Sequence, residues 1–182
     1  AMTTNNTEPR PPTWKVWLLA ARPHTLTASV SPVLVGHSLG LSLLFASSGQ
    51  HAISDHDRRM VGSLAVRFGV FAALIQLATN LHNDYADFVK GADTPERVGQ
   101  ARATQKGWLT PAQTASGATI CLVAALAIGL PLVPPGDAFF LFVILSSVFN
   151  AVAYTGGPYP LGYLGLSNLS IGYSGLGDIF VF

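Results

Sequence analysis

The chain alternates long apolar segments with short polar ones. Four apolar segments cover about residues 25–46, 60–81, 114–133 and 138–154, and a fifth begins near Leu176. Apolar runs of about 20 residues with few charges are typical of transmembrane helices, because a helix of that length crosses the hydrocarbon layer. The pattern therefore predicts an all-α fold, a polytopic bundle of transmembrane helices with four full spans and the start of a fifth.

The same pattern predicts the domain organisation. Residues 1–13 are polar and rich in proline, and we expect them to form a disordered lead-in. Residues 14–182 would form one transmembrane domain. Because the fifth apolar run reaches Phe182 without a helix stop, we expect this domain to be incomplete at its C-terminus, as the N-terminal part of a longer bundle.

A stripe of polar side chains interrupts the second apolar segment and continues beyond it. Its members are Gln76, Asn80, Asn83, Asp84 and Asp87. On an α-helix these spacings place all five within an arc of roughly 100°. Carboxylates are costly at membrane depth, so two that face the same way indicate a functional site, although a helix end whose acids are simply solvated is the alternative. Carboxylate and amide oxygens suit a hard cation such as Mg²⁺.

Composition supports the membrane class. Charged residues make up 10% of the chain and hydrophobic residues 49%, whereas a typical soluble domain has about 25% charged residues. Nothing in the charge pattern indicates a nucleic-acid partner. The single cysteine, Cys121, excludes an intramolecular disulfide.

Lys and Arg predict the orientation in the membrane. The N-terminal segment and the loop after the second span carry Arg10, Lys15, Arg22, Lys90, Arg97, Arg102 and Lys106. The loop after the first span carries only Arg58 and Arg59. Because positive residues are enriched in cytoplasmic loops, we expect the N-terminus and the loop over residues 83–106 to be cytoplasmic.

That loop places acidic residues first and basic residues after them. Arg102 and Lys106 are four residues apart, so a short helix would point both in the same direction. An acidic cluster for Mg²⁺ beside cations for phosphate oxygens is the arrangement that a diphosphate ester needs. A membrane location indicates that the diphosphate belongs to a lipid. The alternative for the two cations is a purely topological role.

The motifs of this region resemble a known family. The chain reads NDYADFVKGADTPERVG and then RATQKG, with ARPHTL upstream and YTGGPYPLGYLG downstream. In this order the motifs resemble the UbiA superfamily of intramembrane prenyltransferases. Within it they are most similar to the branch that prenylates 1,4-dihydroxy-2-naphthoate in menaquinone biosynthesis. The resemblance covers about residues 14–182. It implies a multi-pass protein of the bacterial inner membrane, in which Mg²⁺ between two Asp-rich motifs holds a polyprenyl diphosphate.

Roles for individual residues follow from the stripe and from the resemblance. The implied metal ligands are Asn83, Asp84, Asp87 and Asp93. The implied catalytic residues are Asp84, Asp87, Arg102 and Lys106. The substrate contacts that we expect are Arg22, Asn80, Asn83, Tyr154 and Tyr159, with the two tyrosines at the aromatic acceptor.

The activity that the resemblance implies is Mg²⁺-dependent transfer of a polyprenyl group from its diphosphate to 1,4-dihydroxy-2-naphthoate. Diphosphate and CO₂ would be lost, giving demethylmenaquinone. Spacing alone supports only a membrane site for Mg²⁺ and a diphosphate. One alternative is another aromatic acceptor within the superfamily. Others are an ion transporter or channel, and a chain that binds lipid diphosphate without turnover because the second Asp-rich motif is expected beyond Phe182. The cations beside the acids favour a polyphosphate over a transported Na⁺ or H⁺.

Overall fold

The computed structural model describes residues 10–47, 54–91 and 102–156, and side chains among them up to residue 153. All regular structure in these ranges is helical, which confirms the predicted all-α class. The helices are α1 (Thr13–Ala21), α2 (Leu26–Ser47), α3 (Asp55–Val89), α4 (Pro111–Gly129) and α5 (Ala138–Gly156), and 3₁₀ turns cover Pro23–Thr25 and Leu130–Leu132.

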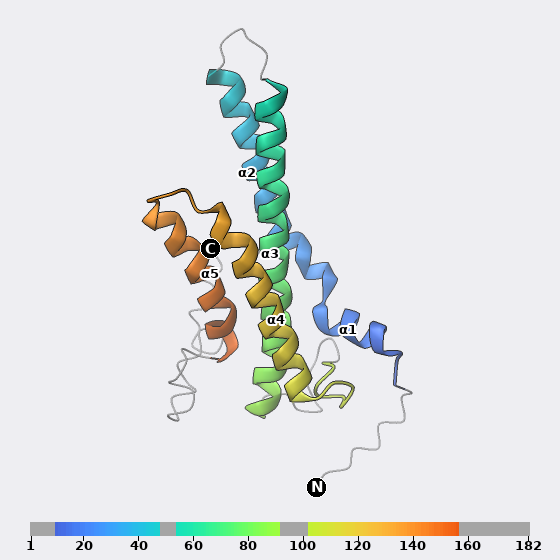
Figure 1. The fold of residues 1–182 in the computed structure, drawn as a ribbon. Helices are drawn as coiled ribbons and strands as arrows, with labels where there is room; N and C mark the ends of the chain where they lie inside the picture. The colour runs from blue at the N-terminus through green and yellow to red at the C-terminus, as the bar shows by residue number, and fades with distance from the viewer. Residues whose placement is uncertain (1–9, 48–53, 92–101, 157–182) are drawn as a thin grey trace.

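Helix α3 is the central element of the described structure. It contacts each of the other four helices. Figure 1 shows α2 beside the first part of α3, and α1 and the start of α4 beside its last part. With 35 residues, α3 is about 50 Å long at the usual rise per residue. Because the hydrocarbon layer is only ~30 Å thick, α3 extends past it and carries the polar stripe toward one face of the membrane.

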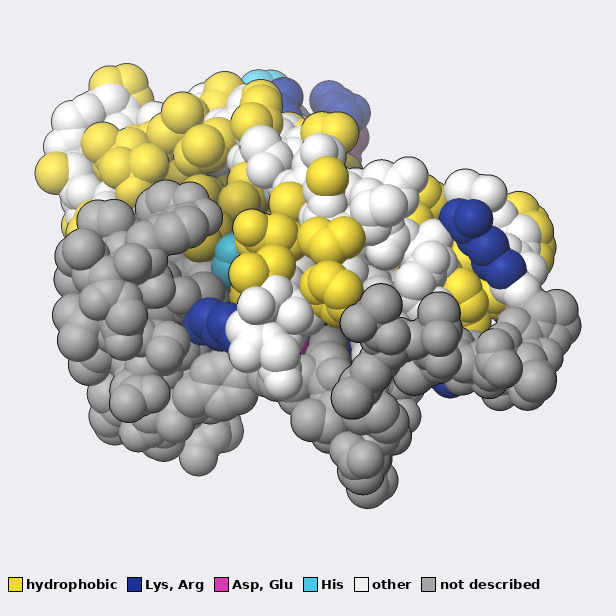
Figure 2. All heavy atoms as spheres, turned by 90° about the horizontal axis from the view of Figure 1, so that it is seen from below, with side chains coloured by type: hydrophobic (Ala, Val, Ile, Leu, Met, Phe, Trp, Pro, Cys, Tyr) yellow, Lys and Arg dark blue, Asp and Glu magenta, His cyan; other side chains and the backbone are white. Residues whose placement is uncertain are grey.

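Three helical segments are long and apolar enough to cross a membrane: Thr13–Ser47, Asp55–Val89 and Pro111–Leu132. The first three predicted spans fall within them. The fourth falls on a shorter apolar helix, Ala138–Ala153, and the fifth lies outside the described residues. Seen from the end where α3 finishes, hydrophobic side chains cover much of the described surface (Figure 2). Exposed apolar residues on α2 and α5, including Leu34 and Phe139, fit helix faces in a lipid environment.

Local sequence determines where the two long helices around the site begin and end. The Ser54 hydroxyl caps α3 by accepting a hydrogen bond from Asp57 N at 3.1 Å. Thr110 and Gln113 form a capping box at the start of α4. Helix α3 was expected to end near residue 81 but continues to Val89, because no helix breaker occurs before Gly91, which has a φ of 67°. The two aspartates are therefore on the helix itself.

Two buried apolar clusters hold the helices together. The cluster beside the polar stripe joins α1, α3, α4 and the segment that leads into α4, through Val16, Ala20, Leu81, Ala103, Leu109 and Ala118. The second joins the middle of α3 to α4 and α5 through Phe71, Ala125 and Ile144. Gly129 lets α4 approach closely here, since a Cβ atom at this position would lie 2.8 Å from the Phe71 ring.

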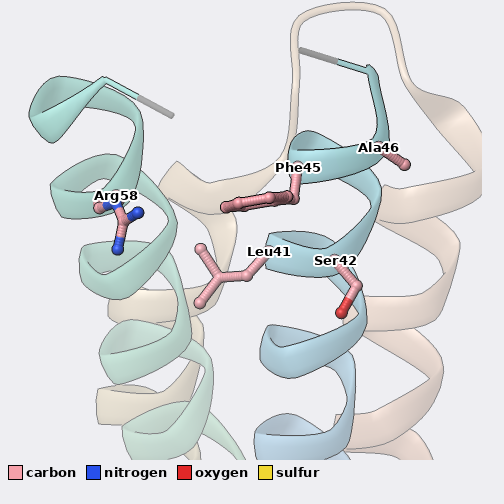
Figure 3. Close-up of a pocket in the computed structure, with 5 residues that line it drawn as sticks. All are labelled: Leu41, Ser42, Phe45, Ala46 and Arg58. Atoms are coloured by element: carbon pink, nitrogen blue, oxygen red, sulfur yellow. The ribbon is translucent and has the colours of Figure 1, made fainter. Parts of the chain in front are cut away.

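Two grooves separate α2 from α3 at some distance from the stripe. One of about 420 Å³ is lined by residues of the middle of α2 and the first half of α3, Pro32 and Phe68 among them. The other, of about 460 Å³, lies where α2 ends and α3 begins, and Leu41 and Phe45 project across it toward the helix that carries Arg58 (Figure 3). None of the stripe residues lines either groove.

Candidate functional site

The polar stripe faces the interior of the protein. Asn80 is 4% exposed, Asp84 0% and Asp87 4%, and Gln76 and Asn83 are half-buried. The shared face predicted from the spacing is therefore present, and it is covered by α1 and by the segment that leads into α4.

Two arginines from different parts of the chain pair with the buried aspartates. The Arg22 guanidinium, between α1 and α2, donates a hydrogen bond to Asp84 Oδ1. Arg102 pairs with Asp87 through Nη1, and its Nε lies 3.8 Å from Asp84 Oδ1. Arg102 is itself only 6% exposed. These four side chains form a buried ion cluster in which two positive charges balance two negative ones, as buried charges require.

Backbone groups complete the surroundings of Asp84. Ala103 N donates to Asp84 Oδ2 at 3.3 Å, and Arg102 Nη1 donates to Asn83 O at 2.8 Å. Arg102 and Lys106 begin and end one helical turn, with a hydrogen bond of 3.0 Å from Lys106 N to Arg102 O. The turn that their spacing predicts is thus present. Arg102 is buried against the aspartates, and Lys106 is half-buried.

Arg22 occupies the break between α1 and α2. Helix α1 ends there because Pro23 has no N–H to continue the helical hydrogen bonds. Arg22 takes a left-handed conformation with a φ of 50°, and among the described residues no other non-glycine residue has a positive φ. This conformation costs an L-residue roughly 1–2 kcal/mol, so contacts around the turn must hold it in place.

Further positive charge lies at the same end of the molecule. Lys90 directly follows α3, three residues after Asp87. Partial burial lowers the pKa of the Lys90 ammonium group, and the attraction of Asp87 opposes this shift. Viewed from this end, Lys and Arg atoms are visible on the described surface, while Asp and Glu atoms are almost hidden (Figure 2). The arrangement suits an anionic ligand.

The chemistry of the donors fits a divalent cation that is shared with a phosphate. Mg²⁺ is commonly bound by one or two carboxylates together with substrate phosphates and water. Asp84 and Asp87 lie one turn apart on α3 and supply two such carboxylates. Over residues 10–47, 54–91 and 102–156, no three His, Cys, Asp or Glu side chains come together as a metal-binding group. A closed site made only by these protein residues is therefore not formed.

The structure brings together most of the predicted residues that it describes. Arg22, Asp84, Asp87 and Arg102 contact one another, and Asn83 joins them through its carbonyl group. The expected metal ligand Asp93 and the expected acceptor contact Tyr159 lie outside the described residues, as does the side chain of Tyr154.

Sequence reasoning did not find Thr25 or the Ala103 backbone donor, both of which contact members of the site. The Arg-Pro pair at the helix break was the available signal for the turn at Arg22. The functional roles of all site residues remain predictions.

Comparison with known proteins tests the resemblance drawn from the motifs. Residues 29–180 match the sequence profile of the UbiA prenyltransferase family. The chain belongs to the UbiA prenyltransferase family. The motif-based recognition of this family is confirmed, and with three apolar helices of sufficient length this UbiA chain is a multi-pass membrane protein.

Several UbiA relatives carry the same name, 1,4-dihydroxy-2-naphthoate octaprenyltransferase. The protein of Escherichia coli (strain K12) is 34% identical over 163 residues, which cover 86% of this chain and 48% of the relative. The protein of Bacillus subtilis (strain 168) is 32% identical over 167 residues, covering 91% of this chain and 48% of the relative. The chain thus spans about half the length of the curated relatives it matches. No solved structure gives a significant match.

Proposed function

We propose that this chain provides the diphosphate-binding part of a prenyltransferase of menaquinone synthesis. The reaction transfers a polyprenyl group from polyprenyl diphosphate to 1,4-dihydroxy-2-naphthoate, with loss of diphosphate and CO₂, to give demethylmenaquinone. The observation that carries this proposal is the buried cluster of Asp84, Asp87, Arg22 and Arg102 at one end of an apolar helical protein. The names of the UbiA relatives support the choice of acceptor.

The two arginines bind the diphosphate in this proposal. A guanidinium group matches phosphate oxygens as well as it matches carboxylate oxygens, and it stays charged at all physiological pH values. Arg22 and Arg102 contact carboxylates in this structure, so substrate binding exchanges one kind of oxygen partner for another. With Lys106, they stabilise the negative charge that develops on the leaving group as the C–O bond breaks.

Asp84 and Asp87, with Asn83, would hold Mg²⁺, which supplies further neutralisation of the departing diphosphate. The apolar helices keep water from the allylic cation that departure of the diphosphate leaves behind. The naphthoate ring then attacks this cation. Residues of the acceptor pocket are proposed to include Tyr154 and Tyr159.

Membrane location and orientation belong to the same proposal. The cluster lies at the end of α3 where the basic residues Arg10, Lys15, Arg22 and Arg102 gather in the chain. Because positive residues favour the cytoplasmic side, the site would open to the cytoplasm of a bacterial inner membrane.

Prenyl transfer in membranes that lack an endogenous enzyme tests the proposal. Membranes with the 182-residue chain receive polyprenyl diphosphate, 1,4-dihydroxy-2-naphthoate and Mg²⁺, and mass spectrometry detects the product. We expect product formation that is lost with a chelator and with Asp84→Asn, but retained with Asp55→Asn, a change at an exposed aspartate at the other end of α3. Product that survives Asp84→Asn contradicts the role of the cluster.

The length of the relatives defines a second arm of this test. If the chain alone gives no product, the assay is repeated with the chain extended to the length of its relatives, and with other aromatic acceptors. Turnover of another acceptor alone replaces the naphthoate in the proposal. No turnover of any acceptor by the extended chain overturns it.

A further inference from the structure

Hydrogen bonds on both sides of Arg22 fix the break between α1 and α2. Arg22 N donates to Leu18 O at 3.2 Å. The Arg22 carbonyl accepts two hydrogen bonds, from Thr25 N and from Thr25 Oγ1, each at 2.9 Å. The residue in the left-handed conformation is therefore tied to α1 through its N–H and to the following turn through its carbonyl group.

Asn80 connects this turn to α3. Its amide nitrogen donates to Ala21 O at 2.7 Å and to Thr25 Oγ1 at 2.9 Å. Its amide oxygen accepts a hydrogen bond from Gln76 Nε2 at 3.3 Å. Both amide hydrogens of this buried side chain thus serve the residues on either side of Arg22.

Helix α3 consequently contacts the Arg22 region at two levels. Asn80 binds the backbone and the hydroxyl group around the turn, and Asp84, one helical turn further on, binds the Arg22 guanidinium. A left-handed non-glycine residue persists only when its surroundings impose it. The long arginine side chain reaches a defined position only when its backbone is fixed.

We propose that Thr25 and Asn80 are positioning residues, which impose the left-handed turn at Arg22 and thereby seat its guanidinium at Asp84. The seating concerns this chain's own geometry, and its use for a diphosphate rests on the function proposed above. The Thr25 hydroxyl is the central element, because it accepts from Asn80 and donates to the Arg22 carbonyl. Serine can make both hydrogen bonds, and alanine can make neither.

Thr27 offers a matched control. Its Oγ1 donates to His24 O at 2.9 Å, which repeats the local hydrogen bond of Thr25 three residues back along the chain. Thr27 is exposed, whereas Thr25 is half-buried against α3. Thr27→Ala removes a similar local bond without touching the connection to Asn80.

Chemical modification of Arg22 reports the seating without any substrate. The full chain in lipid nanodiscs is treated with phenylglyoxal, and mass spectrometry follows the peptide that contains Arg22, with exposed Arg67 as the internal reference. Thr25→Ala and Asn80→Ala should each accelerate modification of Arg22 about fivefold, the factor that loss of one net hydrogen bond produces. Thr25→Ser and Thr27→Ala should leave the rate unchanged. Unchanged rates in the first two variants, or an equal acceleration by Thr27→Ala, overturn the positioning role.

Binding of magnesium farnesyl diphosphate to the same nanodiscs tests the consequence for the site. Thr25→Ala should weaken binding severalfold when Arg22 is present, and should have no further effect in the Arg22→Ala background. An undiminished effect in that background shows that Thr25 acts independently of Arg22 and contradicts the inference. If Arg22→Ala leaves binding unchanged, the proposed diphosphate role of Arg22 fails, and the modification rates still decide whether Thr25 and Asn80 position it.

Discussion

Replacing Asp84 by asparagine removes the negative charge that Arg22 and Arg102 share, while the shape of the side chain is kept. Asp84 has no exposed surface, accepts a hydrogen bond from Ala103 N and pairs with Arg22. The variant leaves two guanidinium groups beside a neutral amide. We expect it to lower the free energy of unfolding substantially.

The structure gives the magnitude of this loss. Removing one partner of a buried ion pair typically costs about 3–5 kcal/mol, because the other charge remains buried without compensation. Arg102 keeps its contact with Asp87, and the Arg22 side chain is 19% exposed, so water partly solvates it. Both features place the expected loss near the lower end, at about 3 kcal/mol.

Reversible unfolding of the full chain in mixed detergent micelles measures this value. Fluorescence of Trp17, which packs against the buried cluster beside the site, follows the transition. Asp55→Asn serves as the control, since Asp55 is exposed in the first turn of α3 and interacts mainly with the helix dipole, worth about 0.3–1 kcal/mol. If Asp84→Asn costs no more than Asp55→Asn, the buried ion cluster does not hold these segments together.

Arg102→Lys keeps the charge but loses the planar guanidinium that reaches both aspartates. It should weaken binding of magnesium farnesyl diphosphate about tenfold, as expected for one lost charge-assisted hydrogen bond of about 1.5 kcal/mol, and an unchanged dissociation constant would argue against a diphosphate contact. Gly129→Ala places a methyl group where a Cβ lies 2.8 Å from the Phe71 ring, so micelle unfolding should show a loss of about 1–3 kcal/mol. Gly69→Ala, which meets no neighbour within 4 Å, should show no such loss, and equal effects of the two would refute the packing argument.

The polar face of α3 was predictable from the sequence because it depends on helical periodicity alone. The spacing of Asn80, Asp84 and Asp87 places them on one side of any helix, and the structure buries all three. The family was predictable for a different reason, since its motifs are contiguous in the chain and occur in a fixed order.

The end of α3 was less predictable because hydrophobicity defines a membrane span but not a helix. The apolar run ends near residue 81, whereas the helix continues to Val89. The additional turns are stabilised by contacts of their polar side chains with Arg22 and Arg102. Such contacts depend on the tertiary fold.

The arrangement around Arg22 was not predictable from local patterns. Asn80 and Ala21 are separated by 59 positions in the sequence and meet only through the packing of α1 against α3. The expected role of Asn80 was substrate contact, and its printed hydrogen bonds lie within the protein. A periodic pattern shows which face a side chain occupies, but not which distant backbone group lies opposite.

Equilibrium binding of tritiated farnesyl diphosphate to the chain in nanodiscs tests the central proposal, a metal-dependent diphosphate site at the ion cluster, most directly. We expect saturable binding that requires Mg²⁺, disappears when Asp84 and Asp87 are both replaced by asparagine, and persists in Asp55→Asn. Binding that is equally tight in the presence of a chelator, or that survives loss of both aspartates, would contradict this assignment of the site.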